Sequence, residues 1–188
     1  MAIKIYIDQG HNPQNPNAGA EGNGLREQDI VYRIGQELAE RLRANGNFEV
    51  RLSRPSEDTV LGTTNSTSLT TRVRQANAWG ADIFLSLHTN AATNTNATGS
   101  EALIYSTSST VANDLATDIL SEMTALTGLR NRGVIERPGL YVLRRTAMPA
   151  ILVEMGFITN PGDAALMRDQ PDLFALGIYN GILEYFGL

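Results

Sequence analysis

Apolar residues alternate or cluster in several short segments, which is the pattern of β-strands. Isoleucines alternate with polar residues across residues 2–8, so we expect an opening strand with one apolar side. Two later segments, 82–88 and 150–155, are almost continuously apolar, as is typical of strands buried on both faces. Weaker strand patterns lie at residues 48–53, 101–105 and 139–143.

Helical spacing of apolar residues fills the segments between these strands. Apolar residues recur every three or four positions after Glu27, so we expect a helix that begins near that residue. It should end at Asn45-Gly46, because glycine readily adopts the left-handed conformation of a helix C-cap. A second helix is predicted from a Ser68 cap to Gly80. Further helices are predicted at residues 110–127, after Asn160-Pro161 and at 174–186.

Strands that alternate with helices are characteristic of α/β proteins built around one sheet. The chain has 188 residues, of which 42% are hydrophobic, and this suits a core of ordinary size. We therefore expect a single domain over residues 1–188.

Charge and composition disfavour several classes of function. The net charge is -5 and no run of basic residues occurs, so a nucleic-acid partner is disfavoured. The absence of cysteine excludes disulfides and thiolate chemistry, and leaves any metal site to His, Asp and Glu. No segment approaches the ~18 apolar residues that span a bilayer, so we expect no membrane insertion. A monomer is the default expectation.

The chain has only two histidines, and each lies at the end of a strongly apolar predicted strand. Open α/β sheets bind ligands at the carboxyl ends of their strands, so His11 and His88 are candidates for one metal site. Glu27 begins the first predicted helix, close to the same edge. Its carboxylate either stabilises the positive end of the helix or completes a His₂Glu zinc site with a fourth position open.

Glu154 is the carboxylate that is hardest to explain structurally, because it follows four apolar residues of a strand predicted to be buried. A buried carboxylate is costly unless it is paired or functional. One interpretation is a salt bridge to Arg144 or Arg145. The other is a general base that deprotonates zinc-activated water and later protonates the leaving nitrogen.

Three other polar residues each have two open interpretations. Glu101 either lines the cleft or faces solvent. Asn90 either orients a ligand or caps a turn, and Asp8 either orients His11 or ends a strand. The sequence has no HExxH, GxSxG or GxxxxGK[ST] motif, so the commonest zinc-protease, serine-hydrolase and nucleotide-binding interpretations lack their signatures.

Three segments in order give the chain a family resemblance. The segments IDQGH with Glu27 downstream, SLHTNA (86–91) and PAILVEMGFITN (149–160) resemble the N-acetylmuramoyl-L-alanine amidase family of autolysins, sporulation lysins and phage endolysins. The resemblance implies an α/β fold with a mixed, twisted sheet of about six strands, flanked by helices on both faces. It also implies hydrolysis of the amide bond between N-acetylmuramic acid and L-alanine in peptidoglycan.

The same resemblance implies roles for four residues. His11, Glu27 and His88 would bind one zinc ion per chain, and Glu154 would be the catalytic acid and base. Residues 141–149 are similar to the family's stretch before the catalytic strand, but their individual roles stay unassigned.

Two other functions compete with the amidase. A zinc peptidase of carboxypeptidase type would use the same ligand set, and would release single amino acids instead of intact peptides. A catalytically silent cell-wall-binding module would keep the fold and fail to clear wall suspensions.

The expected place of action is the cell wall. The first residues lack the basic and long apolar regions of a secretory signal. We therefore expect either cytoplasmic synthesis with release by lysis, or an excised domain of a secreted protein.

Overall fold

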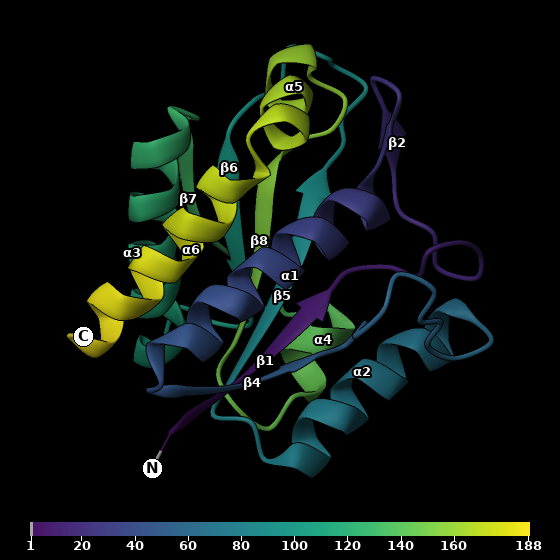
Figure 1. Cartoon of the computed structure of the whole chain (residues 1–188). Coiled ribbons are helices and arrows are strands. Elements are labelled where there is room, and N and C mark those ends of the chain that lie inside the picture. The colour runs from purple at the N-terminus through teal and green to yellow at the C-terminus, as the bar shows by residue number, and fades with distance from the viewer. Residues whose placement is uncertain (1) are drawn as a thin grey trace.

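A six-stranded twisted sheet forms the centre of the protein (Figure 1), in a computed structural model that describes residues 2–188. The strand order is β4-β1-β5-β8-β6-β7. The first four of these strands run parallel, whereas β6 pairs antiparallel with β8 and parallel with β7. The expected mixed sheet is therefore confirmed. The strands are β1 Ile3–Gln9, β4 Phe48–Leu52, β5 Ile83–Asn90, β6 Ser100–Ile104, β7 Asn131–Glu136 and β8 Ala150–Phe157.

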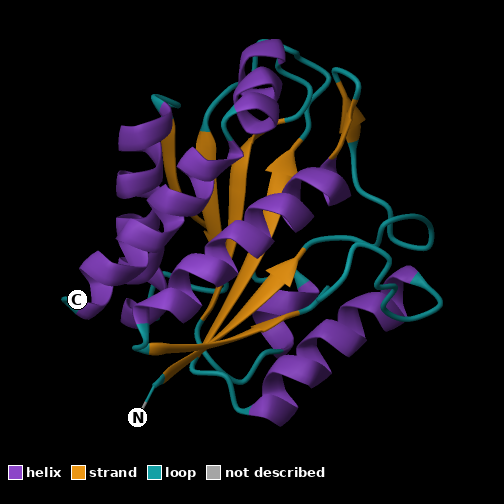
Figure 2. Ribbon diagram, viewed as in Figure 1, coloured by secondary structure: helices purple, strands orange, loops and turns teal. Residues whose placement is uncertain are grey.

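Helices cover both faces of the sheet (Figure 2), as expected. One face packs against α1, α3 and α6 through the larger apolar core. The opposite face packs against α2 and α4 through a smaller core around Tyr6, Phe84 and Leu152. The helices are α1 Glu27–Asn45, α2 Asn65–Trp79, α3 Thr110–Thr127, α4 Tyr141–Arg145, α5 Pro161–Asp169 and α6 Pro171–Phe186.

Two glycines bring α6 unusually close to α3. A Cβ atom at Gly177 would lie 2.4 Å from the Cα atom of Met123, and a Cβ atom at Gly181 would lie 2.4 Å from the Cα atom of Ile119. Only residues without a side chain allow backbones to approach to this distance. The helix pair is therefore held by direct backbone packing.

The connections create a topological switch point between β1 and β5. Helix α1 leads from β1 to β4 on one face, whereas α2 leads from β4 to β5 on the other. The strand order thus reverses between the neighbours β1 and β5. In α/β sheets, ligands bind beyond the carboxyl ends of the strands at such a switch point.

Several local predictions were wrong. The segment 139–143 does not form a strand, because residues 141–145 form the short helix α4, which buries Val142 and Leu143. Helix α2 begins at Asn65, since Thr64 and Thr67 form a capping box one turn before Ser68. The sequence patterns also missed β7 and the small hairpin of β2 (Glu21–Gly22) and β3 (Leu25–Arg26).

Membrane-spanning helices were not expected from the sequence. Across residues 2–188, none of the helices combines the length and the apolar character that a bilayer crossing requires.

Candidate functional site

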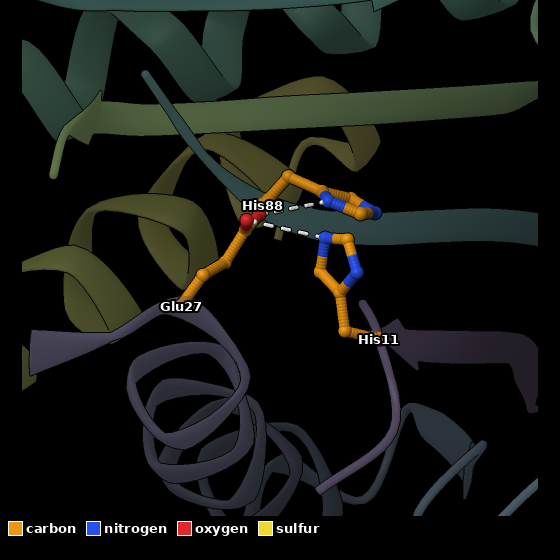
Figure 3. Close-up of side chains that lie close together, drawn as sticks. All are labelled: His11, Glu27 and His88. Atoms are coloured by element: carbon orange, nitrogen blue, oxygen red, sulfur yellow. Dashed lines mark hydrogen bonds and ion pairs between the residues drawn. The ribbon is translucent and has the colours of Figure 1, made fainter. Parts of the chain in front are cut away.

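Three side chains from separate elements converge at the carboxyl ends of β1 and β5 (Figure 3). His11 follows β1, Glu27 begins α1, and His88 lies on β5. The Nε2 atom of His11 lies 3.2 Å from Glu27 Oε2, and the Nδ1 atom of His88 lies 3.0 Å from Glu27 Oε1. The structure therefore brings together the three residues that the sequence marked as candidate ligands.

Two glycines make room for this convergence. A Cβ atom at Gly10 would lie 2.5 Å from His88 Cε1, so the imidazole lies directly over the backbone that follows β1. A Cβ atom at Gly19 would lie 2.8 Å from the Glu27 side chain and 2.9 Å from His11 Cδ2. The small residues of the loop therefore set how closely the three side chains can approach.

The Glu27 carboxylate is buried and fixed by backbone donors. Its Oε2 atom accepts a hydrogen bond from the amide of Ala20, and its Oε1 atom accepts one from the amide of Thr89. Burial alone would raise the pKa of Glu27, but hydrogen bonds and charge from His11 and His88 outweigh burial and hold the pKa well below its usual range. The group is therefore an anion between two imidazoles.

The donor types fit a zinc ion. Ligand atoms at about 2.0–2.1 Å from a tetrahedral zinc ion lie about 3.3 Å from one another. The two His–Glu distances, 3.2 and 3.0 Å, are close to that separation, although they reach different oxygens of Glu27, and the set as a whole is wider, with its ligand atoms within 4.8 Å of one another. The Nδ1 atom of His11 is also buried without a hydrogen-bond partner, which marks a ring whose polar contacts are incomplete.

Glu154 lies next to His88 across the sheet. The two residues are partners in the β5–β8 pairing, so their side chains lie on the same face. The Oε2 atom of Glu154 is sealed from solvent and has no hydrogen-bond partner. Among the described residues neither Arg144 nor Arg145 pairs with it, because both are exposed on α4. The salt-bridge interpretation of Glu154 was therefore wrong.

The environment of Glu154 favours its protonated form. Burial raises the pKa of Glu154 to about 8, with further contributions from the negative charges of Glu27 and Glu101. A carboxyl group with such a pKa can exist in both protonation states near neutral pH, so it can accept a proton as the carboxylate and return it as the acid.

This raised pKa has a measurable effect on stability. In the unfolded chain the pKa of Glu154 returns to about its ordinary value of 4.5, so the folded state binds the extra proton between pH 4.5 and 8. Stability should therefore fall as pH rises through this window. Urea unfolding of chelator-treated protein at pH 7 should find Glu154→Gln more stable than the parent, by on the order of 3 kcal/mol. The unfolding free energies of Glu154→Gln and the parent should converge near pH 4.5. Glu49→Gln, an exposed control, should match the parent at every pH. Equal stability of Glu154→Gln and the parent at pH 7 would contradict the raised pKa of Glu154.

Glu101 belongs to the same row of side chains. It pairs with Glu154 across the antiparallel β6–β8 contact and is only 7% exposed. Asn90 Nδ2 donates to its Oε1 atom at 3.0 Å, and Arg132 Nε donates to its Oε2 atom at 2.8 Å. Glu101 therefore faces the site and not solvent. Asn90 fixes this carboxylate and also accepts a hydrogen bond from the amide of Ala91 within the turn.

Asp8 supports His11 through the backbone and not through the ring. Its carboxylate contacts Arg72 and Ser86, and no hydrogen bond joins it to His11 among residues 2–188. Arg72, from α2, also donates to the carbonyl oxygens of Gln9 and His11. Burial would raise the pKa of Asp8, but the charge and hydrogen bond of Arg72 hold it below its usual range. Arg72 is the residue that the sequence patterns missed.

Removal of Arg72 should destabilise the protein strongly. The pair is almost completely buried, with side chains 1% and 2% exposed, so Arg72→Met leaves the Asp8 carboxylate without a partner. Loss of one partner of a buried ion pair costs about 3–5 kcal/mol. Chemical denaturation measures this cost, and Arg168→Gln, which breaks an exposed pair with Asp169, is the control. Equal unfolding midpoints for the two variants would show that the buried pair contributes nothing.

One known protein family matches the chain over almost its whole length. A family profile described as N-acetylmuramoyl-L-alanine amidase matches residues 5–184. The chain belongs to this family of hydrolases. The expected family resemblance is therefore confirmed over nearly the whole chain.

Relatives of the amidase family match in sequence and in structure. The chain is 38% identical over 186 residues to N-acetylmuramoyl-L-alanine amidase LytC of Bacillus subtilis, covering 97% of this chain but 35% of that protein. It is 36% identical over 189 residues to the amidase CwlM of Bacillus licheniformis, covering 99% of this chain and 70% of the relative. The crystal structure of an N-acetylmuramoyl-L-alanine amidase from Clostridium difficile 630 superposes with a TM-score of 0.88 at 31% identity, covering 99% of this chain and 97% of that one. The chain thus spans about a third of the length of LytC.

A small pocket adjoins the three side chains in this amidase-family fold. Its volume is about 120 Å³, and His11 and His88 form one side of it. The other side is largely apolar, from Leu69 on α2 and from Leu140 and Tyr141 at the start of α4. The pocket therefore extends from the two histidines toward α2 and α4.

Proposed function

We propose that the chain is a zinc-dependent amidase that hydrolyses the bond between N-acetylmuramic acid and L-alanine in peptidoglycan. His11, Glu27 and His88 hold one zinc ion per chain, and Glu154 is the catalytic acid and base. The observation that carries the proposal is the half-buried Glu154, whose Oε2 atom is sealed from solvent and unpaired, beside a cluster whose three ligand atoms lie within 4.8 Å of one another. Family membership supplies the substrate class.

Each protein group has a separate part in the reaction. Zinc, when bound, acts as a Lewis acid on the lactyl carbonyl and makes water acidic enough to attack near neutral pH. Glu154 removes a proton from the attacking water and then delivers it to the nitrogen of L-alanine as the C–N bond breaks. The backbone amides of Ala20 and Thr89 hold the Glu27 carboxylate in a fixed orientation throughout the hydrolysis.

The experiment combines metal content with product analysis. Elemental analysis should find about one zinc ion per chain, and chelation should stop hydrolysis of purified peptidoglycan until zinc is restored. Mass spectrometry should detect intact stem peptides that begin with L-alanine. Release of single amino acids instead would identify a carboxypeptidase, and wall binding without hydrolysis in the zinc-loaded protein would identify a silent wall-binding module.

The domain organisation and the oligomeric state belong to the same proposed function. We propose that residues 1–188 form one catalytic domain that acts on the cell wall as a monomer. Sedimentation of the purified protein tests the monomer, since a self-associating chain would show a mass well above 20.4 kDa.

A further inference from the structure

An open groove lies between α2 and α4, beside the pocket at the histidines. Its volume is about 620 Å³, and its lining includes Thr70, Arg74 and Asn77 from α2 and Tyr141 and Arg145 from α4. Tyr141 lines both cavities, so the groove begins where the 120 Å³ pocket ends. Any ligand that enters from this side passes Tyr141 before it reaches His11 or His88.

The groove is formed by two segments that have no acidic residues. Segments 59–81 and 137–153 contain five arginines and no aspartate or glutamate, whereas the whole chain has 20 acidic residues and a net charge of -5. These segments supply both helices that line the groove. The groove lining thus carries two arginines and no carboxylate in an otherwise acidic protein, and positive charge of this kind attracts anionic ligands.

The two arginines of the groove are available for binding. Arg74 and Arg145 are both exposed, and among residues 2–188 neither side chain forms an ion pair or a hydrogen bond with the protein. Only the backbone oxygen of Arg145 is used, as acceptor for Asn77 Nδ2. Arg72, by contrast, already forms an ion pair with Asp8 and is buried. The groove thus presents two free guanidinium groups, which bind carboxylates with good geometry.

We propose that this groove binds the acidic peptide stem of peptidoglycan through its carboxylates, and so makes Arg74 and Arg145 determinants of substrate specificity. The inference rests on the proposed amidase function. Charge decides which part of the substrate lies here, because the N-acetylated sugars are uncharged and the lactyl carboxyl group is tied up in the scissile amide. The anionic groups that remain belong to the stem, where a glutamate or its amide follows L-alanine.

The length of the path agrees with this assignment. Leu69 lines the pocket at the histidines, and Arg74 follows it by five residues on α2, which corresponds to about 7.5 Å along the helix axis. An extended peptide advances about 3.3–3.6 Å per residue. The axial separation of Leu69 and Arg74 therefore corresponds to roughly two residues of an extended peptide, and the first acidic residue of the stem is its second residue.

The test compares two substrates that differ in a single charge. Uncross-linked glycan strands are prepared with the stem glutamate either as a free carboxylate or as its carboxamide. The zinc-loaded parent protein should cleave the carboxylate form with the higher kcat/KM. The double variant Arg74→Gln/Arg145→Gln should lose roughly tenfold in kcat/KM on the carboxylate strand, mainly through KM, and little on the carboxamide strand.

Arg144→Gln is the matched control. Arg144 has the same charge and exposure as its neighbour Arg145, but it lines a different cavity with Tyr105 and Ser109. This variant should retain the parent's kcat/KM on both strands. An equal loss in Arg144→Gln would mean that net charge alone matters and would overturn the assignment of the groove.

Other outcomes separate this inference from the function on which it rests. If the parent cleaves both strands but the double variant keeps the preference for the carboxylate, the groove proposal fails and the amidase stands. If the parent cleaves neither strand, the proposed function fails and the inference falls with it. If the double variant loses only binding to walls that carry teichoic acid, the groove binds a polyphosphate chain, and the assignment to the stem is wrong.

Discussion

Replacement of Glu154 by glutamine should lower kcat on purified peptidoglycan by about 10²- to 10⁴-fold, the usual contribution of a general acid and base. The substitution keeps the shape of the side chain but removes its ability to accept a proton from water. Zinc content should remain at about one ion per chain, because His11, Glu27 and His88 are unchanged. Dye release from labelled peptidoglycan measures turnover, and elemental analysis measures the metal.

The outcome for Glu154→Gln separates a chemical role from a structural one. Because one oxygen of this carboxyl group is sealed from solvent without a partner, the variant should be at least as stable as the parent near neutral pH, so loss of folding cannot explain loss of turnover. Glu49→Gln, on the exposed side of β4, should retain full activity. Turnover near that of the parent protein would remove Glu154 from the mechanism.

Replacement of His88 by alanine should abolish both metal binding and hydrolysis. His88 supplies one of only three candidate ligand side chains in the cluster, and two remaining ligands hold zinc poorly. We expect zinc content to fall from about one ion per chain to background, with no measurable clearing of wall suspensions. Elemental analysis after dialysis and turbidity assays test both expectations.

Chelated parent protein is the reference for His88→Ala. Added zinc should restore clearing by the parent and not by the variant, while circular dichroism shows that both remain folded. A variant that binds zinc at parent levels and clears walls would require a different ligand set, and would remove His88 from the proposed site.

The candidate site could be predicted because its residues interrupt strong apolar patterns. His88 and Glu154 each follow a run of residues that only a buried strand explains, and His11 lies just beyond the opening strand. Since parallel strands end at the same edge of a sheet, these interruptions were expected to converge. The structure places the His88 and Glu154 side chains on one face, as partners in the same strand pair.

Other features could not be predicted because they depend on distant partners. Arg72 contacts Asp8 across 64 positions of sequence, and nothing near either residue marks the pairing. Strand β7 was missed because it is an edge strand with few buried side chains, and Gly133 within it has a left-handed backbone. Helix α4 was taken for a strand because five residues are too few to distinguish the two periodicities.

The position of β8 has a consequence for how the chain folds during synthesis. This strand, residues 150–157, is the last of the described strands along the chain, yet it lies in the middle of the sheet between β5 and β6. Until it emerges from the ribosome, both neighbours have open edges that can pair with other chains. Glu154 arrives on the same strand, so a nascent chain carries His11, Glu27 and His88 long before it carries Glu154. The proposed hydrolytic site is therefore completed only at the step that also pairs the open edges of β5 and β6.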